Sequence, residues 1–485
     1  MTVPVQRTGI VVKPNHARVV FRPFLQGDES RTLKILARLM SLTEDEVGAE
    51  LTSVLQEFRG RHQKPLQFFL AMFERIADSL ITDRPPSDNR RLLAGAYFTQ
   101  EYSLESAALF NPSIVPHPDQ AGVPEGAVRM VVSLRATGEG HLSSITFRTG
   151  LIGPAGEIRL DKPTGYVSLP TPVPDHEYDK PLFARKLSEL ALANGISEAV
   201  LNLLEDRFTL GELRRATSAV RRQHPDRRTE ADATIGGMIT LAQSNYRISY
   251  DGDTDLSERI IFPFSPTESA GIEDARWVLF TEEDGGQKYY ATYSAYDGRV
   301  VLPQLVETTD FRDFKITTLN GPMVKNKGFA LFPRRIRGSY YMLSRQDGEN
   351  VYLMPSESLQ FWNTKQVLLK PTYPWEFVQL GNCGSPLETG RGWLVLTHGV
   401  GPLRKYAIGV VVLDQDDPSR VIGRMAEPLL APDANEREGY VPNVVYSCGG
   451  MIHHDLLILP YAMSDYASTF ATVELDEIWE AMTWA

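Results

Sequence analysis

Short apolar segments that end in a glycine- or aspartate-containing turn recur from residue 128 to the end of the chain. Five of them resemble one another: VRMVVSLRATGEG (128–140), QKYYATYSAYDGR (287–299), GSYYMLSRQDGE (338–349), RGWLVLTHGVGP (391–402) and HDLLILPYAMSD (454–465). A period of about 50 residues built from hairpins is typical of β-propeller blades. We therefore predict a mainly β protein, a five-bladed β-propeller. A β-sandwich with appended helices is the alternative, but it gives no reason for the repeat.

Two other segments show the 3.6-residue periodicity of amphipathic helices. Residues 30–80 carry three apolar stripes, and a capping box at residues 43–46 begins the second. Residues 175–245 carry leucines at helical spacing. We predict an N-terminal extended and helical extension over residues 1–95, a propeller domain over residues 96–485, and a helical insertion after the first blade at about residues 175–245. We expect the N-terminal helices to bury apolar faces against a second subunit, which predicts a homo-oligomer.

Composition limits the possible partners. The net charge of −11 disfavours general binding to nucleic acid or to an anionic membrane. Cys383 and Cys448 are the only cysteines, so the chain has neither a disulfide framework nor a CxxC metal pattern. We expect a cytoplasmic protein, because no signal-peptide pattern begins the chain and no apolar segment approaches the roughly 20 residues of a membrane span. Six arginines of the insertion predict a solvated helix face, with a nucleic-acid patch as the alternative: Arg214, Arg215, Arg221, Arg222, Arg227 and Arg228.

Polar residues follow the apolar strands of the five repeats. The innermost strand of each propeller blade lines a shared central channel, so residues at the strand exits converge although they are far apart in the sequence. The exits hold Arg135, Tyr296, Arg345, His398 and Tyr461. A polar set that converges on one cavity is a usual geometry for a ligand site.

Several stretches, spread over roughly residues 105–480, resemble one enzyme family. They are ALFNPSIV (108–115), GIEDARWV (271–278), KNKGFALFP (325–333), GWLVLTHGV (392–400), YAIGVVVLDQDDPSRVIGR (406–424), GYVPNVVYSCG (439–449) and LILPYAMSD (457–465). In this order they resemble glycoside hydrolase family 130, five-bladed propeller enzymes that act on β-mannosides. The resemblance implies a phosphorylase that cleaves a β-mannoside with inorganic phosphate, inverts the anomeric centre and releases α-mannose 1-phosphate.

The resemblance also implies residue roles. Asp274 matches the family's general acid, which protonates the glycosidic oxygen through a sugar hydroxyl. The family motif usually reads Gly-x-Glu-Asp-Pro-Arg, and here Ala275 replaces the proline, which contributes no chemistry. We expect phosphate binding by His398, Tyr406, Arg148, Arg299 and Lys327. We expect substrate binding by Asn111, Arg135, Glu273, Arg345, Tyr461 and Asp465. Phosphate would be a co-substrate, and we expect neither a metal nor another cofactor.

Two alternatives stay open. A phosphate-independent, inverting β-mannosidase needs a carboxylate base that activates water, and Glu388 and Glu436 are the candidates. Glu388 stands near a position where the family's phosphorylases often carry a lysine, which favours this alternative. A sugar-binding propeller without catalysis is the other alternative, and it gives no reason for acids and bases to gather at the strand exits.

Overall fold

The computed structural model describes residues 3–485 except for residues 26, 28, 81, 83, 175 and 224. The chain forms two compact units. The larger unit contains Met1–Pro14, Ala107–Pro163 and Leu169–Ala485, and the smaller unit contains Asn15–Ser106 and Thr164–Ser168.

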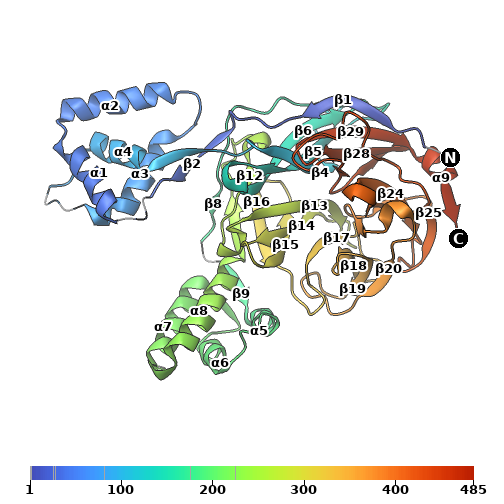
Figure 1. Cartoon of the computed structure of the whole chain (residues 1–485). Coiled ribbons are helices and arrows are strands. Elements are labelled where there is room, and N and C mark those ends of the chain that lie inside the picture. The colour runs from blue at the N-terminus through green and yellow to red at the C-terminus, as the bar shows by residue number, and fades with distance from the viewer. Residues whose placement is uncertain are drawn as a thin grey trace. The chain divides into compact units, whose positions relative to one another are not determined.

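The larger unit is mainly β, and its described residues form five antiparallel sheets of four to six strands, besides a two-stranded sheet in the insertion described below (Figure 1). The first sheet contains β4 (Ala108–Pro116), β5 (Val128–Thr137), β6 (Ser143–Ile152), β7 (Ile158–Leu160) and β12 (Ile260–Ile261). The second contains β13 (Gly271–Thr281), β14 (Gln287–Tyr296), β15 (Val301–Thr308), β16 (Asp313–Thr318), β11 (Tyr246–Ser249) and β8 (Thr171–Pro172). The third contains β17 (Lys327–Leu331), β18 (Tyr340–Arg345), β19 (Val351–Ser356) and β20 (Gln366–Leu369).

The last two sheets are built in the same way, and each also takes in a terminal strand. The fourth contains β21 (Gln379–Asn382), β22 (Leu387–Thr389), β23 (Gly392–Val400), β24 (Tyr406–Leu413), β25 (Val421–Met425) and β30 (Met482–Trp484). The fifth contains β26 (Val445–Tyr446), β27 (Met451–His453), β28 (Leu456–Met463), β29 (Ala467–Glu474) and β1 (Gln6–Val12). The helix α9 (Leu475–Glu480) lies between β29 and β30. Because β1 pairs with β29, with Gln6 opposite Thr472, the first 14 residues belong to the larger unit and not to an N-terminal extension.

Neighbouring sheets are joined by buried apolar clusters in chain order. Phe147 of the first sheet packs with Trp277 of the second, Phe280 of the second lies in one cluster with Met342 of the third, and Phe332 of the third packs on Trp393 of the fourth. Leu396 of the fourth shares a cluster with Leu459 of the fifth. A smaller cluster joins Ala462 of the fifth sheet to Ala108 and Phe110 of the first. Because full burial of one such side chain contributes about 1.5–3 kcal/mol, these clusters hold the sheets together.

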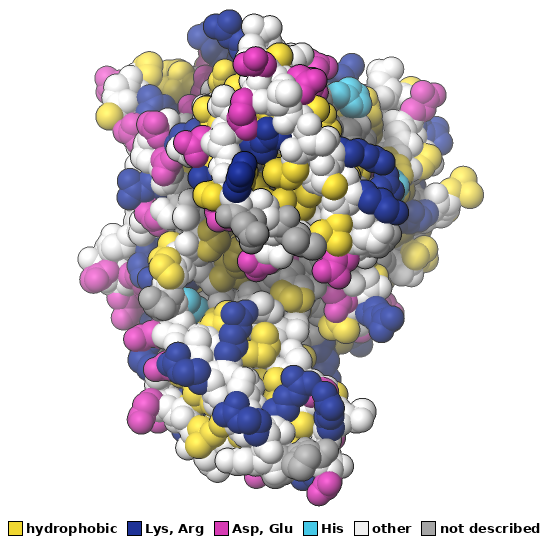
Figure 2. Space-filling view, turned by 90° about the vertical axis from the view of Figure 1, so that its left-hand side faces the viewer, with side chains coloured by type: hydrophobic (Ala, Val, Ile, Leu, Met, Phe, Trp, Pro, Cys, Tyr) yellow, Lys and Arg dark blue, Asp and Glu magenta, His cyan; other side chains and the backbone are white. Residues whose placement is uncertain are grey.

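A helical insertion follows the first sheet. It contains β9 (Glu177–Asp179), α5 (Lys180–Glu189), α6 (Gly195–Leu201), β10 (Arg207–Thr209), α7 (Leu210–Gln223) and α8 (Arg228–Gln243), around an apolar core of its own. Asp179 caps α5 by accepting from the backbone N–H of Leu182, and Asn194 caps α6. The six arginines predicted on a solvated face are all exposed, and Figure 2 shows Lys and Arg side chains among acidic ones on this lower part of the molecule. Arg221 pairs with Asp232 at 2.9 Å and Arg227 with Glu230 at 2.7 Å.

The smaller unit is a helical body with one two-stranded antiparallel sheet. It contains β2 (Val19–Pro23), β3 (Thr99–Ser103), α1 (Glu29–Ser41), α2 (Glu44–Glu57), α3 (Pro65–Ile76) and α4 (Asp88–Tyr97). The predicted capping box is present at the start of α2, where Thr43 and Glu46 bond to each other's backbone N–H. A fully buried ion pair, Arg18 Nε to Glu105 Oε1 at 2.8 Å, joins the segment before β2 to the segment after β3. None of the helices in the described parts of the chain has the length and apolar character that crossing a bilayer requires.

Candidate active site

One edge strand in each of the first three sheets is interrupted by an irregularity. The register shifts between Phe110 and Ser113 in β4, between Glu273 and Arg276 in β13, and between Lys327 and Ala330 in β17. An irregularity of this kind re-aims a side chain that regular alternation would place in the core. At two of these places a non-glycine residue takes the left-handed conformation, Asn111 with φ 49° and Asp274 with φ 55°. Such a conformation costs about 1–3 kcal/mol and gathers at functional sites.

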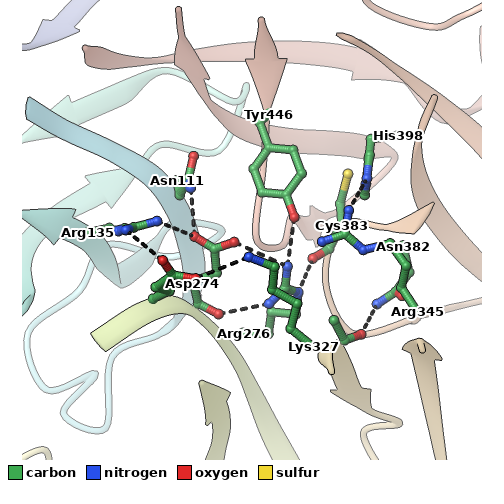
Figure 3. Close-up of polar contacts among 12 residues, drawn as sticks. Asn111, Arg135, Asp274, Arg276, Lys327, Arg345, Asn382, Cys383, His398 and Tyr446 are labelled. Atoms are coloured by element: carbon green, nitrogen blue, oxygen red, sulfur yellow. Dashed lines mark hydrogen bonds and ion pairs between the residues drawn. The ribbon is translucent and has the colours of Figure 1, made fainter. Parts of the chain in front are cut away.

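The re-aimed side chains of Asn111 and Asp274 meet (Figure 3). Asn111 Nδ2 donates to Asp274 Oδ1 at 2.7 Å. Arg135 Nη1 lies 3.5 Å from the same oxygen, and Arg276 Nη2 lies 3.7 Å from Asp274 Oδ2. Arg276 Nη1 also donates to the Asp274 backbone carbonyl at 2.9 Å, which holds the left-handed turn in place. Asp274 is only 7% exposed, so water screens these charges poorly.

The cations around Asp274 keep it ionised. Burial alone would raise the pKa of this carboxyl, but Arg135, Arg276 and Lys327, together with the hydrogen bond from Asn111, outweigh burial and lower the pKa to about 2. Asp274 is therefore a carboxylate at neutral pH.

Glu273 lies between two further cations. Its Oε1 accepts from Arg135 Nη2 at 3.1 Å, and its Oε2 accepts from Lys327 Nζ at 3.2 Å. The bulge in β17 places Lys327 at this position, where Gly328 has φ 89°. Glu273 thus fixes both cations beside Asp274.

Arg276 is the most heavily bonded side chain of the site. It is 2% exposed, and its Nε donates to the Cys383 carbonyl at 2.8 Å while its Nη2 donates to the Tyr446 hydroxyl at 2.7 Å. Cys383 directly follows β21 of the fourth sheet and Tyr446 lies in β26 of the fifth, so one guanidinium connects β13 to both (Figure 3). Because each of its three guanidinium nitrogens donates a hydrogen bond, Arg276 is fixed in place and positions Asp274.

His398 and Arg345 form a second polar pair. Arg345 Nη1 lies 3.1 Å from His398 Nε2, and since a guanidinium only donates, the imidazole accepts and is neutral with its proton on Nδ1. Burial, reinforced by the charges of Arg345 and Arg276, holds the pKa of His398 well below its usual value. Tyr406 stacks on the imidazole, with ring centroids 5.8 Å apart and planes 8° apart. Gly381 makes room for this arrangement, because a Cβ there would lie 2.3 Å from His398 Cε1.

Asp465 is a second carboxyl of the site, and its pKa is raised where that of Asp274 is lowered. It follows β28 in the left-handed conformation, with φ 50°. Burial and then the negative charge of Asp274 raise the pKa of Asp465 to about 6, against the opposing charges of Arg135 and Arg404. Two interacting carboxyls with separated pKa values are a common arrangement in sites that move protons.

Most of the predicted site residues converge. Hydrogen bonds, ring stacking or electrostatic interactions connect Asn111, Arg135, Glu273, Asp274, Lys327, Arg345, His398, Tyr406 and Asp465. Cations outnumber carboxyl groups in and around this set: Arg135, Arg276, Lys327, Arg345 and Arg404 accompany the carboxyl groups of Glu273, Asp274 and Asp465. The excess of positive charge suits an anionic ligand.

Four other predicted residues lie elsewhere. Arg148 is buried and donates to the Thr146 hydroxyl and the Phe147 carbonyl of its own strand. Arg299 is exposed at the tip of the β14–β15 hairpin, beyond Tyr296, whose hydroxyl donates to the Gly298 carbonyl. Tyr461 is fully buried, and its hydroxyl donates to Glu436 at 2.5 Å.

The two carboxylates proposed for hydrolysis are also engaged away from Asp274. Glu436 Oε1 accepts from Arg7 Nε at 3.0 Å and also from Tyr461, so it holds β1 against the fifth sheet. Glu388 pairs with Arg334 at 2.6 Å. Glu388 lies opposite Trp393 of β23. Trp393 and His398 are five residues apart on this strand, and at about 3.3 Å per residue they are roughly 16 Å apart.

Sequence reasoning missed two residues of the site. Tyr446, which receives the Arg276 hydrogen bond, lies in GYVPNVVYSCG, a stretch that carried the resemblance but no assigned role. Asn382 donates to the Gly328 carbonyl at 2.9 Å, which ties β21 to the bulge of β17. Its only sequence signal is a polar residue at the end of a short apolar strand.

The raised pKa of Asp465 generates a stability prediction. Because the pKa of Asp465 is higher in the folded protein than in the unfolded chain, stability that is present below about pH 4 is lost as the pH rises through 6. Asp465→Asn should therefore match the wild type near pH 4 and exceed it at pH 7, by at most about 3 kcal/mol for two pKa units. Urea unfolding of the two proteins at both pH values measures this difference. Asp253→Asn, on an exposed loop, is the control and should show no such change, while equal effects of both variants would contradict the assignment.

Comparisons with known proteins identify the family of the chain. The sequence matches the family model of glycoside hydrolase family 130, described as beta-1,4-mannooligosaccharide phosphorylase, over residues 222–484. A 1,2-beta-oligomannan phosphorylase of Thermoanaerobacter sp. (strain X514) is 33% identical over 248 residues, which cover 49% of this chain and 80% of the relative. A beta-1,2-mannobiose phosphorylase of Listeria innocua is 30% identical over 266 residues, which cover 52% and 73%.

A solved structure is similar as well. The beta-1,2-mannobiose phosphorylase of Listeria innocua in complex with beta-1,2-mannobiose aligns with a TM-score of 0.47 and 21% identity, over 78% of this chain and 92% of that one. The family match covers more than half of the chain and includes Asp274, Arg276, Arg345 and His398. This chain belongs to glycoside hydrolase family 130 and is an enzyme of that family.

Proposed function

We propose that the protein is an inverting β-mannoside phosphorylase, which uses inorganic phosphate to release α-mannose 1-phosphate. The observation that carries this proposal is the excess of positive charge around Asp274, where five cationic side chains accompany the three carboxyl groups of Glu273, Asp274 and Asp465. Water as the nucleophile would need no such excess, whereas phosphate carries between one and two negative charges near neutral pH. The phosphorylase names of the relatives support the same choice.

In this proposal the five sheets are the blades of one propeller. The support is the order of the apolar clusters, which join each sheet to the next and the fifth to the first. The inner strands β4, β13 and β17 then face a common axis, and their bulges turn Asn111, Asp274 and Lys327 toward it. A propeller would thus explain why residues from five repeats share one site.

The phosphate would bind on the side of Arg345, His398 and Lys327. Arginine can give two parallel hydrogen bonds to phosphate oxygens, and charge-assisted bonds of this kind are strong. Neutral His398 accepts from Arg345, which orients the guanidinium, and Tyr406 holds the imidazole plane. The mannose unit would lie among Asn111, Arg135 and Asp465.

Proton transfer would depend on the phosphate. The bond between mannose C1 and the glycosidic oxygen breaks, a bond from C1 to a phosphate oxygen forms on the opposite face, and the leaving oxygen takes a proton from Asp274 through a sugar hydroxyl. In the empty site the cations hold the pKa of Asp274 at about 2. The negative charge of bound phosphate would offset Arg135, Arg276 and Lys327 and raise that pKa, so that Asp274 can carry the proton.

The positions of the candidate bases argue against the hydrolase. Glu388 is paired with Arg334 at the far end of β23 from His398, and Glu436 is bonded to Arg7 and Tyr461. Neither carboxylate lies where it would activate a water beside Asp274.

Removing the proton donor tests the assignment of Asp274. Asp274→Asn keeps the shape of the side chain and loses the proton, so we expect activity on an unactivated mannoside to fall by about 10²–10⁴-fold. Sugar binding, followed by calorimetry, should change little. Asp253→Asn is the control, and wild-type activity in Asp274→Asn would show that another group donates the proton.

Phosphate dependence separates phosphorolysis from hydrolysis. We expect mannose 1-phosphate from β-manno-oligosaccharides only when phosphate is present. Arg345→Met should raise the KM for phosphate by about 10–150-fold, the equivalent of the 1.5–3 kcal/mol of one charged hydrogen bond. Arg299→Met and Glu388→Gln, both outside the site, should leave it unchanged. Release of free mannose without phosphate, unaffected in Arg345→Met and lost in Glu388→Gln, would favour the hydrolase.

A further inference from the structure

A polar cavity of about 210 Å³ lies between the insertion and the second sheet, and no residue that lines it belongs to the site around Asp274. A single ordered water needs only about 10–15 Å³, so the cavity has room for a larger polar molecule. Its lining includes His176, Tyr178, Lys186, Thr317, Asn320 and Gln360. Strand β9 and helix α5 form one wall, and they precede residue 222, where the family match begins.

The wall formed by α5 is fixed to the sheet. Lys186, only 4% exposed, donates from Nζ to the Leu319 carbonyl at 2.9 Å and to Glu189 Oε2 at 3.0 Å. Glu189 Oε1 in turn accepts from the Gly321 backbone N–H at 2.7 Å. These bonds hold α5 at a set spacing from the chain that follows β16, so the cavity exists before any ligand enters.

The opposite wall is the outward face of β16. Phe314 and Ile316 point into the core, and because strand side chains alternate, Lys315 and Thr317 point out toward the insertion. Asn245, from the end of α8, holds the neighbouring Thr318 by accepting from its N–H at 2.8 Å. The cavity is thus preformed on both sides, as ligand sites usually are.

The charges that line the cavity are balanced. Three cationic side chains, Lys186, Lys315 and Arg207, are accompanied by Glu177, by Asp179 and, through its bond to Lys186, by Glu189. Burial, with the charges of Arg247 and Lys315, lowers the pKa of His176 to about 4, which leaves this imidazole neutral. A balanced lining gives no net attraction for an anion, whereas sugar hydroxyls can both donate to and accept from its polar groups.

We propose that this cavity is a second carbohydrate site, which binds one sugar residue of a neutral oligosaccharide independently of the site around Asp274. Aromatic Tyr178 and Phe183 supply an apolar surface for the sugar ring, and Thr317, Asn320 and Gln360 supply hydrogen-bonding groups. The identity of the sugar as a β-manno-oligosaccharide rests on the proposed function.

Counting binding sites tests the proposal. In an Asp274→Asn background, which prevents turnover, titration calorimetry with a β-mannotriose should find two molecules bound per chain. Thr317→Trp fills the cavity and should reduce this number to one. Thr483→Trp makes the same change on an exposed position of β30 and should keep two. One molecule per chain in all three proteins would overturn the proposal, as would two in Thr317→Trp.

A second variant covers the case in which Thr317→Trp does not fold. Gln360→Ala removes one polar group without filling space and should weaken the second binding event by about three- to tenfold, the loss of one neutral hydrogen bond. An unchanged affinity of Gln360→Ala for the sugar would overturn the proposal. It would also be overturned if Thr317→Trp bound one phosphate ion fewer per chain than the wild type but the same number of sugar molecules. The proposed function is tested separately. With Asp274 intact, Thr317→Trp should form mannose 1-phosphate at the same rate as the wild type.

Discussion

The buried guanidinium of Arg276 is the interaction on which the site depends. It comes from β13 and bonds to the Cys383 carbonyl and to the Tyr446 hydroxyl, so it ties the inner edges of three sheets together. The same group bonds to the backbone carbonyl of Asp274 and contributes to the low pKa of its carboxyl. A buried charge is costly unless its partners satisfy it. Here the partners fix both the strained turn and the charge state of the acid.

The left-handed backbone conformations and the like charges of the site lower the stability of the fold. Asn111, Asp274 and Asp465 all take the left-handed conformation, and Asp465 sits close enough to Asp274 for their charges to oppose each other. The cations around the three carboxyl groups of Glu273, Asp274 and Asp465 also repel one another. The apolar clusters between the sheets offset these costs, and in the proposed mechanism bound phosphate would relieve the repulsion.

Much of this was predictable from the sequence, and the failures have physical reasons. Short apolar repeats indicated the sheets, and positions at strand exits, together with the family motifs, indicated Arg135, Asp274 and His398. Periodicity does not reveal a bulge or the direction of a side chain, so Tyr461 and Arg148 were assigned to the site although they face other partners. Glu388 lies on β22, which pairs with the end of β23 that is farther from His398, and the sequence does not show this strand register. The pairing of β1 with β29 joins residues more than 450 positions apart, beyond any local pattern.

The central claim is that the positive charge beside Asp274 exists to hold phosphate. A crystal structure of the enzyme grown with saturating phosphate tests this claim most directly. The account predicts a phosphate ion within hydrogen-bond distance of the Arg345 guanidinium, on the side of the site formed by His398 and Lys327. A site that stays free of phosphate under these conditions, or a phosphate bound only at exposed positions such as Arg299, would contradict it.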